Sequence, residues 1–328
     1  MAERRRPGSA VPRLASVPSS ADAGPVGAYP AALPDVPVIG IVAPSAHGSL
    51  VPHPVPGQTG PRGTPDPART NEFDQPSSAR VYDYLLGGST HGAVDRRCAQ
   101  TLLRHEPQVG HMARAARAFL RRAVRFLLDA GIDQFVDLGS GMPTMGNVHE
   151  VVARAGGNAS VAYVERDATA VSSGRRLLHD HPRAVYVDAD IRDVDAVLDH
   201  PHLRRVVDPA RPVGLLAFAV LQQISDADDP AGLIAAYLSR LAPGSALAVS
   251  HLSTEDGVMS TDEVAGLTSD YAFSSVRPRD RPAIARMVRG VDLVEPGLTF
   301  ASHWRPDLRR TTLRPYDCGH LAGVGFRR

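Results

Sequence analysis

The sequence predicts an α/β fold in which helices cover both faces of a doubly wound, mostly parallel sheet with an antiparallel last strand. Two observations carry this prediction. The segment Gln-Phe-Val-Asp-Leu-Gly-Ser-Gly at residues 134–141 predicts a buried strand followed by a glycine loop. A helical pattern at 147–154 and a predicted strand at 160–165 come after this loop. Strand and helix patterns then alternate toward the C-terminus, as they do in open parallel sheets.

The chain before this unit divides into two regions. Residues 1–70 hold half of the 28 prolines and no sustained periodicity, so residues 1–75 are expected to be a disordered tail. Residues 76–131 are expected to form a helical lid, and residues 132–328 a Rossmann-like domain continuous with it. The lid helices are predicted at 79–86, stopped by Gly87-Gly88, and at 93–105 and 112–130. The arginines of the third helix are interpreted as a solvated face, because no aromatic residues accompany them.

The elements after residue 165 follow from apolar runs and helical spacing. Strands are expected at 184–187, 213–220, 246–250, 291–294 and 321–326, which makes seven in all, and helices at 168–179, 230–241 and 281–288. No helix pattern separates the last two strands. The final strand is therefore expected to run antiparallel to its neighbours.

Composition excludes several classes of protein. The net charge of +1 and the isoelectric point near 8.0 give no overall field that would attract nucleic acid or an acidic membrane, and all 36 basic residues are arginine. No apolar run approaches the roughly 18 residues of a membrane-spanning helix, and no apolar segment of a leader peptide follows the first arginines. Cys98 and Cys318 have no metal-type spacing. We expect a cytoplasmic protein with reduced thiols and no metal.

Three polar features fall at the carboxyl ends of the predicted central strands, where open α/β sheets bind ligands. They are the Asp137–Gly141 loop, Glu165 and the turn 188–190. Glu165 is placed to accept hydrogen bonds from ribose hydroxyls, and Asp190 from an adenine amine. Acidic groups suit a positively charged sulfonium better than a dinucleotide's phosphates, which favours S-adenosylmethionine over NAD. An NAD(P)-dependent oxidoreductase stays an alternative, although the loop lacks a third glycine in register and the chain has no lysine for a Tyr-x-x-x-Lys pair.

The order of motifs resembles that of a family of S-adenosyl-methyltransferases from high-GC bacteria, formerly a domain of unknown function, over residues 76–328. The matching segments are Ala79–Gly88, Phe135–Thr144, Gly146–Val151, Tyr163–Glu165, Asp188–Asp193, Asp228–Pro230, Leu293–Gly297 and Trp304–Asp307. The resemblance implies the seven-stranded class I methyltransferase sheet and S-adenosylmethionine as cofactor. The residues expected to bind it are Asp137, Gly139, Ser140, Gly141, Glu165, Arg166, Asp190, Ile191 and Ala219. Tyr82 and Tyr84 are expected either to fold over the cofactor or to pack in the core.

Two segments depart from the family pattern. The chain has Ser89-Thr-His-Gly92 where the family usually carries Lys and Asn, and Gln222-Gln223 where it usually carries a histidine and an aromatic residue. Because of the second departure, an alternative function stays open, that of a catalytically silent protein that binds S-adenosylmethionine or S-adenosylhomocysteine. His251, at the end of the fifth predicted strand, is interpreted as a general base or as a structural histidine with satisfied hydrogen bonds. The acceptor is expected to be a small molecule, and nothing in the sequence specifies the oligomeric state.

Overall fold

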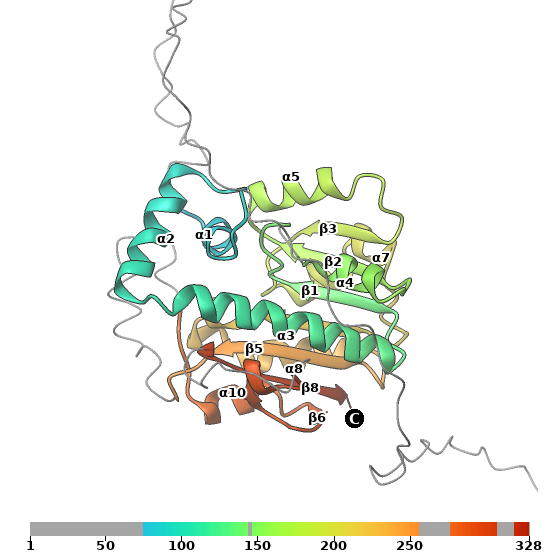
Figure 1. The fold of residues 1–328 in the computed structure, drawn as a ribbon. Coiled ribbons are helices and arrows are strands. Elements are labelled where there is room, and N and C mark those ends of the chain that lie inside the picture. The colour runs from blue at the N-terminus through green and yellow to red at the C-terminus, as the bar shows by residue number, and fades with distance from the viewer. Residues whose placement is uncertain (1–74, 144–145, 256–275, 307–317, 328) are drawn as a thin grey trace, which may run out of the picture. The chain divides into compact units, whose positions relative to one another are not determined.

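A computed structural model describes residues 75–143, 146–255, 276–306 and 318–327 (Figure 1). The expected disordered tail, apart from its last residue, lies outside these ranges. The strands are β1 Gln134–Leu138, β2 Ser160–Glu165, β3 Ala184–Asp188, β4 Gly214–Phe218, β5 Ala246–Leu252, β6 Val291–Leu293, β7 Thr299–Phe300 and β8 His320–Arg327. They form one sheet in the order β3-β2-β1-β4-β5-β8-β6, and β7 pairs with β8.

The strand directions confirm the predicted doubly wound sheet. β3, β2, β1, β4 and β5 pair in parallel, whereas β8 runs antiparallel to both β5 and β6. The sheet has eight strands where the sequence predicted seven. The additional strand is β7, whose two residues pair with β8 through Thr299↔Ala322 and Phe300↔Leu321. Two residues are too few for any hydrophobic alternation to reveal them.

The helices lie close to their predicted bounds. They are α1 Ser78–Leu85, α2 Ala93–His105, α3 Val109–Asp129, α4 Val148–Arg154, α5 Ala168–Leu177, α6 Val194–Leu198, α7 Pro201–Arg204, α8 Pro230–Arg240 and α10 Arg281–Met287. The short helices α6 and α7 were not predicted. Asp193 caps α6 by accepting from the Ala196 N–H, and Pro201 occupies the first turn of α7. None of the described helices is long and apolar enough to cross a membrane.

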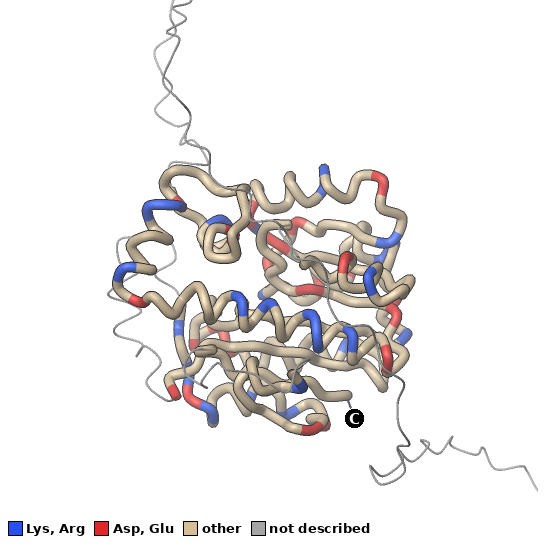
Figure 2. The backbone as a smooth tube through the Cα atoms, viewed as in Figure 1, with Lys and Arg blue, Asp and Glu red and all other residues tan. Residues whose placement is uncertain are grey.

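Hydrophobic side chains cover both faces of the sheet. One face packs mainly against α3 and α4, and the other against α6, α7 and α8. Figure 2 shows several basic positions along α3. The expected solvated arginine face is only partly present, because Arg122 is buried and donates to the backbone oxygens of Ala301 and Trp304 at 2.5 and 2.8 Å. These bonds hold the segment after β7 against α3. The third helix of the lid is therefore also a layer of the sheet domain.

Helices α1 and α2 are joined by a buried ion pair. Arg80 Nε donates to Asp95 at 2.8 Å, and both side chains are fully buried. Asp95 also accepts from the backbone N–H groups of Ser77 and Gly92, at 3.0 and 2.7 Å. Because one carboxylate ties together the start of both helices, α1 and α2 form a unit over the carboxyl ends of the central strands.

Candidate functional site

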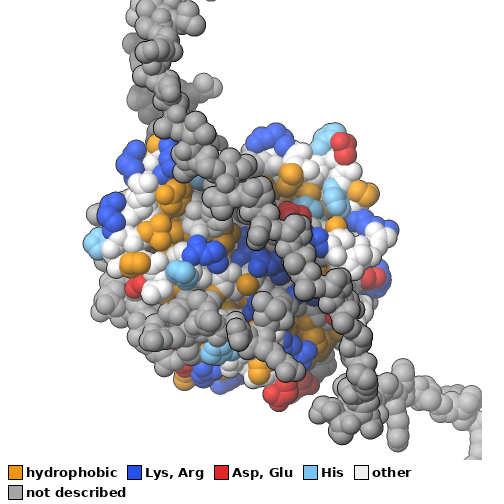
Figure 3. Space-filling view, viewed as in Figure 1, with side chains coloured by type: hydrophobic (Ala, Val, Ile, Leu, Met, Phe, Trp, Pro, Cys, Tyr) orange, Lys and Arg blue, Asp and Glu red, His pale blue; other side chains and the backbone are white. Residues whose placement is uncertain are grey.

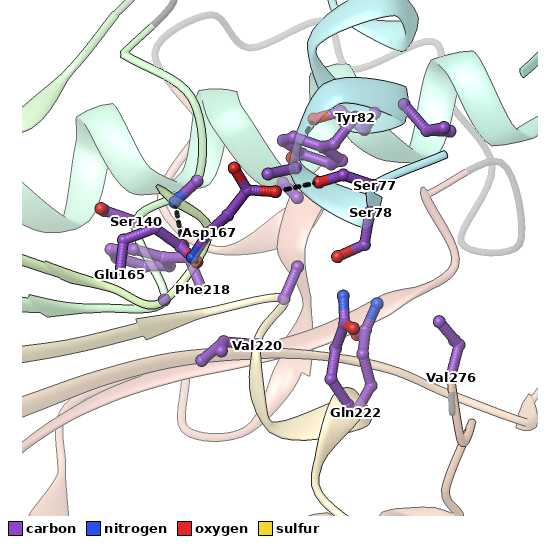
Figure 4. Close-up of a pocket in the computed structure, with 18 of the residues that line it drawn as sticks. Ser77, Ser78, Tyr82, Ser140, Glu165, Asp167, Phe218, Val220, Gln222 and Val276 are labelled. Carbon is purple, nitrogen blue, oxygen red and sulfur yellow. Dashed lines mark hydrogen bonds between the residues drawn. The ribbon is translucent and has the colours of Figure 1, made fainter. Parts of the chain in front are cut away.

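A cavity of about 550 Å³ opens at the carboxyl ends of β1, β2 and β4, within the usual ~300–1,000 Å³ range of small-molecule sites. Helices α1 and α3 contribute its roof, and the segments after β1, β3 and β4 contribute its floor (Figure 4). Nearly all of the residues expected to bind a cofactor line it. They are Asp137, Gly139, Ser140, Gly141, Glu165, Arg166, Asp190, Ile191, Ala219 and Tyr82.

The glycine loop after β1 brings backbone to the cavity without side chains. Gly139 and Gly141 have φ values of 60° and 69°, in the left-handed region that favours glycine. A Cβ on Gly139 would overlap the side chain of Val220. The N–H of Ser140, between them, donates to the Val164 oxygen at 3.1 Å and so fixes the loop to β2.

Glu165 ends β2 with a buried carboxylate that faces the cavity. One oxygen accepts from the N–H of Gly141 at 2.8 Å, and the other accepts from the N–H groups of Arg166 and Asp167 at 2.8 and 2.9 Å. Glu165 is 8% exposed to solvent. Three backbone donors therefore hold an anionic acceptor rigidly in position, and the oxygen that accepts from Gly141 keeps a lone pair for a ligand donor.

Asp190 lies beyond β3 at the same end of the cavity. Arg192 donates to it at 2.6 Å and Arg166 lies 3.4 Å away. These bonds, above all those from Arg192, lower the pKa of Asp190 to about 2. Ile191, which is 7% exposed, contributes an apolar wall beside this fixed carboxylate.

Asp137 and Arg117 both line the cavity and interact electrostatically. Burial raises the pKa of Asp137 to about 7; the nearby carboxylate of Glu165 adds to this rise, and the Arg117 guanidinium opposes it. Arg117 reaches the cavity from α3, and its Nε is buried without a hydrogen-bond partner among the described residues. The sequence analysis assigned Arg117 to the solvated face, because it is one of several arginines along the helix. A cation with unused donors facing a cavity is suited to an anionic group of a ligand.

The segment after β4 forms the floor of the cavity. Ala219 adopts φ 53°, an uncommon conformation for a residue with a side chain, and its N–H donates to the Ser250 oxygen at 2.9 Å. Gln222 also lines the cavity and accepts from the Leu252 N–H through its side-chain oxygen at 2.9 Å. Gln222 therefore holds the end of β5, and Gln223 lines the cavity beside it.

The two tyrosines of α1 point to different places. Tyr82 lines the cavity, donates to the Ala113 oxygen at 3.2 Å and packs its ring 5.9 Å from the Arg117 guanidinium. Tyr84 does not line the cavity; its ring meets the edge of His91 in a separate hollow between α1 and α2. Residues two apart on a helix lie on opposite sides, which is why the pair could not both cover one ligand.

His251 occupies a structural position that does not fit a general base facing the cavity. It is fully buried, its Nδ1–H donates to the Leu252 oxygen at 2.8 Å, and its Nε2 accepts from Arg279 at 2.9 Å. Burial lowers its pKa to about 3. Because the remaining lone pair is already used, the imidazole holds Arg279 in place rather than taking a substrate proton.

His320, a residue absent from the sequence prediction, lines the cavity at the start of β8. Its neighbours in the cavity wall come from α3 and β5, about 70 or more residues away in the sequence. No local pattern could have identified it.

Comparison with known proteins found a matching family and similar structures. Residues 66–328 match the model of a family described as S-adenosyl methyltransferase. A protein of Thermobifida fusca classed as a methyltransferase is 36% identical, with 78% of this chain and 96% of that chain covered and a TM-score of 0.73. A DUF574 family protein from Streptomyces avermitilis is 32% identical, with 78% and 99% covered and a TM-score of 0.73. The comparison with curated proteins gave no match.

Proposed function

Since this chain belongs to the S-adenosyl methyltransferase family, we propose that it transfers the methyl group of S-adenosylmethionine to a small-molecule acceptor bound in the cavity beneath α1 and α3. The cofactor supplies a methyl group on a positively charged sulfur, which an acceptor atom can displace directly. The protein's contribution is then positioning and electrostatics, and it needs no nucleophile of its own.

The observation that carries the proposal is Glu165, a buried carboxylate fixed by three backbone N–H groups and facing the cavity. Such a group suits the paired hydroxyls of a ribose. Figure 4 places Glu165 and Ser140 together on one side of the opening, below Ser77 and Tyr82. We assign this side to the nucleoside.

Other residues of the cavity suit the remaining parts of the cofactor. Asp190 and Ile191 offer a fixed acceptor and an apolar wall, which suit an adenine amine and ring. Arg117 offers a guanidinium, which suits the carboxylate of the amino-acid portion. Gly139 and Ser140 of the glycine loop also line the cavity, so a ligand can lie against this loop. The residues present therefore fit S-adenosylmethionine.

A small acceptor is supported by the size of the site. The cavity has a volume of about 550 Å³ and is lined by residues of α1 and α3 as well as the strand ends. On the face seen in Figure 3, the visible basic side chains are interspersed with hydrophobic and uncharged ones.

The test is to incubate the full-length protein with methyl-labelled S-adenosylmethionine and either the small-molecule or the macromolecular fraction of a bacterial extract. We expect label in the small-molecule fraction. Glu165→Ala should abolish it, and Asp180→Ala, whose side chain is 95% exposed, should not. Label confined to macromolecules would contradict the proposed acceptor. Cofactor binding without any transfer would identify a catalytically silent binding protein instead.

A further inference from the structure

The end of the cavity opposite Glu165 is built differently from the nucleoside side. Figure 4 shows Gln222 and Val276 on this side, away from Ser140 and Glu165. Met112, Leu252 and Val276 pack together here, and His320 lies beside Leu252 because these two residues are partners in the β5–β8 pairing.

We call Met112, Gln222, Leu252, Val276 and His320 the acceptor end, and all five line the cavity. None of these side chains carries a charge while His320 is neutral. Among the described residues of this end, a charged ligand group would lose its hydration without gaining a partner of opposite charge, which is unfavourable. The acceptor end therefore suits an uncharged, largely apolar molecule.

His320 supplies one unused hydrogen-bond acceptor in this apolar surrounding. Its Nδ1–H donates to the Cys318 oxygen at 3.2 Å, which leaves the lone pair on Nε2. Nε2 is buried and has no hydrogen-bond partner among the described residues, and the residue is 5% exposed. A buried acceptor without a donor is energetically unfavourable, so a bound donor would be favoured.

Burial also keeps this imidazole neutral. It lowers the pKa of His320 to about 4, whereas the hydrogen bond to the Cys318 oxygen acts in the opposite direction. His251, on the neighbouring strand, is neutral for the same reason. At neutral pH the Nε2 lone pair is therefore available.

On these observations, and resting on the proposed methyl transfer, we propose that the acceptor is a neutral, largely apolar molecule that presents an O–H or N–H group to Nε2 of His320, which takes up its proton. The acceptor heteroatom's lone pair forms the bond to the methyl carbon, and the C–S bond pair stays on sulfur. The proton passes to Nε2 and later to water. Because the heteroatom becomes positively charged as the new bond forms, its proton is acidic enough for a weak base.

The experiment uses full-length protein saturated with S-adenosylhomocysteine and three probes of one shape: 2-naphthol, 2-methoxynaphthalene and 2-naphthoate. Calorimetry should show 2-naphthol binding at least about tenfold more tightly than its methyl ether, the typical gain from one satisfied buried hydrogen bond. The charged 2-naphthoate should bind least. In His320→Phe the advantage of 2-naphthol should vanish while affinity for S-adenosylhomocysteine stays unchanged.

Two further measurements keep the test decisive. His320→Gln, which retains an acceptor oxygen, should preserve part of the advantage, and His179→Phe, at a side chain that is 82% exposed, should behave as wild type. In the wild-type protein, the ¹⁵N resonance of His320 Nε2 should shift with 2-naphthol and not with its methyl ether, even if His320→Phe fails to fold.

The outcomes separate this inference from the proposed function. Equal binding of 2-naphthol and its ether, or binding of neither to protein that holds S-adenosylhomocysteine, would overturn the assignment of the acceptor end. Failure of wild-type protein to bind S-adenosylhomocysteine would instead overturn the proposed function.

Discussion

Glu165 serves both the fold and the ligand site through a single carboxylate. It accepts from the N–H groups of Gly141, Arg166 and Asp167, which belong to the glycine loop and to the turn into α5. The same side chain faces the cavity. Its removal would therefore leave three donors unpaired and, in the proposed function, also remove the acceptor for the ribose.

We predict that Glu165→Ala lowers affinity for S-adenosylmethionine by about 1.5–3 kcal/mol, the cost of losing charged hydrogen bonds. We also expect the free energy of unfolding to fall by about 1–3 kcal/mol, because backbone donors lose their acceptor. Calorimetry and urea denaturation measure the two effects, with Asp180→Ala as control. Unchanged affinity would place the nucleoside elsewhere.

Arg117 is predicted to bind the amino-acid carboxylate of the cofactor. Arg117→Gln should weaken S-adenosylmethionine about tenfold to a hundredfold, whereas Arg114→Gln, on the exposed side of the same helix, should not. Decarboxylated S-adenosylmethionine should bind to Arg117→Gln and to the wild type with equal affinity. If it bound more weakly to Arg117→Gln than to the wild type, the guanidinium would act on another group of the cofactor.

Asp137 should make stability depend on pH. Its pKa is raised to about 7 in the folded chain, chiefly by burial, against about 3.9 in the unfolded chain. The stabilisation that protonated Asp137 gives to the folded state is therefore fully present below about pH 4 and is lost as the pH rises through 7. This loss lowers the free energy of unfolding by up to about 4 kcal/mol. Asp137→Asn should remove this slope, which urea midpoints at pH 5 and 8 would measure. Parallel slopes in both proteins would contradict a buried, protonated Asp137.

The sequence predicted the cofactor side of the site better than the acceptor side. Gly139 and Glu165 could be found because they end strands in a recognisable βαβ unit, so their position follows from local pattern. His251 and His320 could not be told apart in this way. They lie on neighbouring strands, and only the tertiary structure distinguishes them. Arg279 donates to Nε2 of His251, whereas Nε2 of His320 has no hydrogen-bond partner among the described residues.

At the scale of elements, α1 is connected to the ribose side of the cavity through Asp167. Asp167 caps α5 by accepting from the Ala170 N–H at 3.0 Å, receives the Ser77 hydroxyl, and lies 3.8 Å from Arg80. Figure 4 shows the contact between Ser77 and Asp167 across the opening. Because the backbone N–H of Asp167 also donates to Glu165, the positions of α1 and of the Glu165 carboxylate are linked.

We predict that Arg80→Leu loosens α1 and α2 without unfolding the sheet. It leaves the buried carboxylate of Asp95 without its cation, at a cost of about 3–5 kcal/mol. Hydrogen exchange should show at least about a hundredfold loss of protection in Ser78–Leu85 and little change in β1 and β4. Arg104→Leu, at an exposed position of α2, is the control. Equal loss of protection in the sheet would mean that the lid is not a separate cooperative unit.

The predicted elements differ from the structure where local signals are short. The bounds 93–105 were correct because a glycine precedes the helix and apolar spacing runs through it. The helices α6 and α7 have five and four residues, less than the span needed to establish a helical period. The two residues of β7 depend on pairing with β8, which only the tertiary structure supplies.

At the scale of the whole molecule, the sheet order explains why one cavity collects residues from so much of the chain. β1 and β4 are adjacent in the centre, so the segments that follow them diverge and leave an opening at their carboxyl ends. The antiparallel β8 then brings His320 beside the end of β5. The nucleoside side and the acceptor end are thus two parts of a single crevice.

The central claim is that this crevice binds S-adenosylmethionine, and calorimetric titration of the full-length wild-type protein tests it most directly. S-adenosylmethionine and S-adenosylhomocysteine should each bind at one site per chain, and NAD should show no binding at the same concentrations. The reason is that the cavity carries acidic groups and that its glycine loop lacks the third glycine of dinucleotide-binding loops. Binding of NAD with no binding of S-adenosylmethionine would contradict the account.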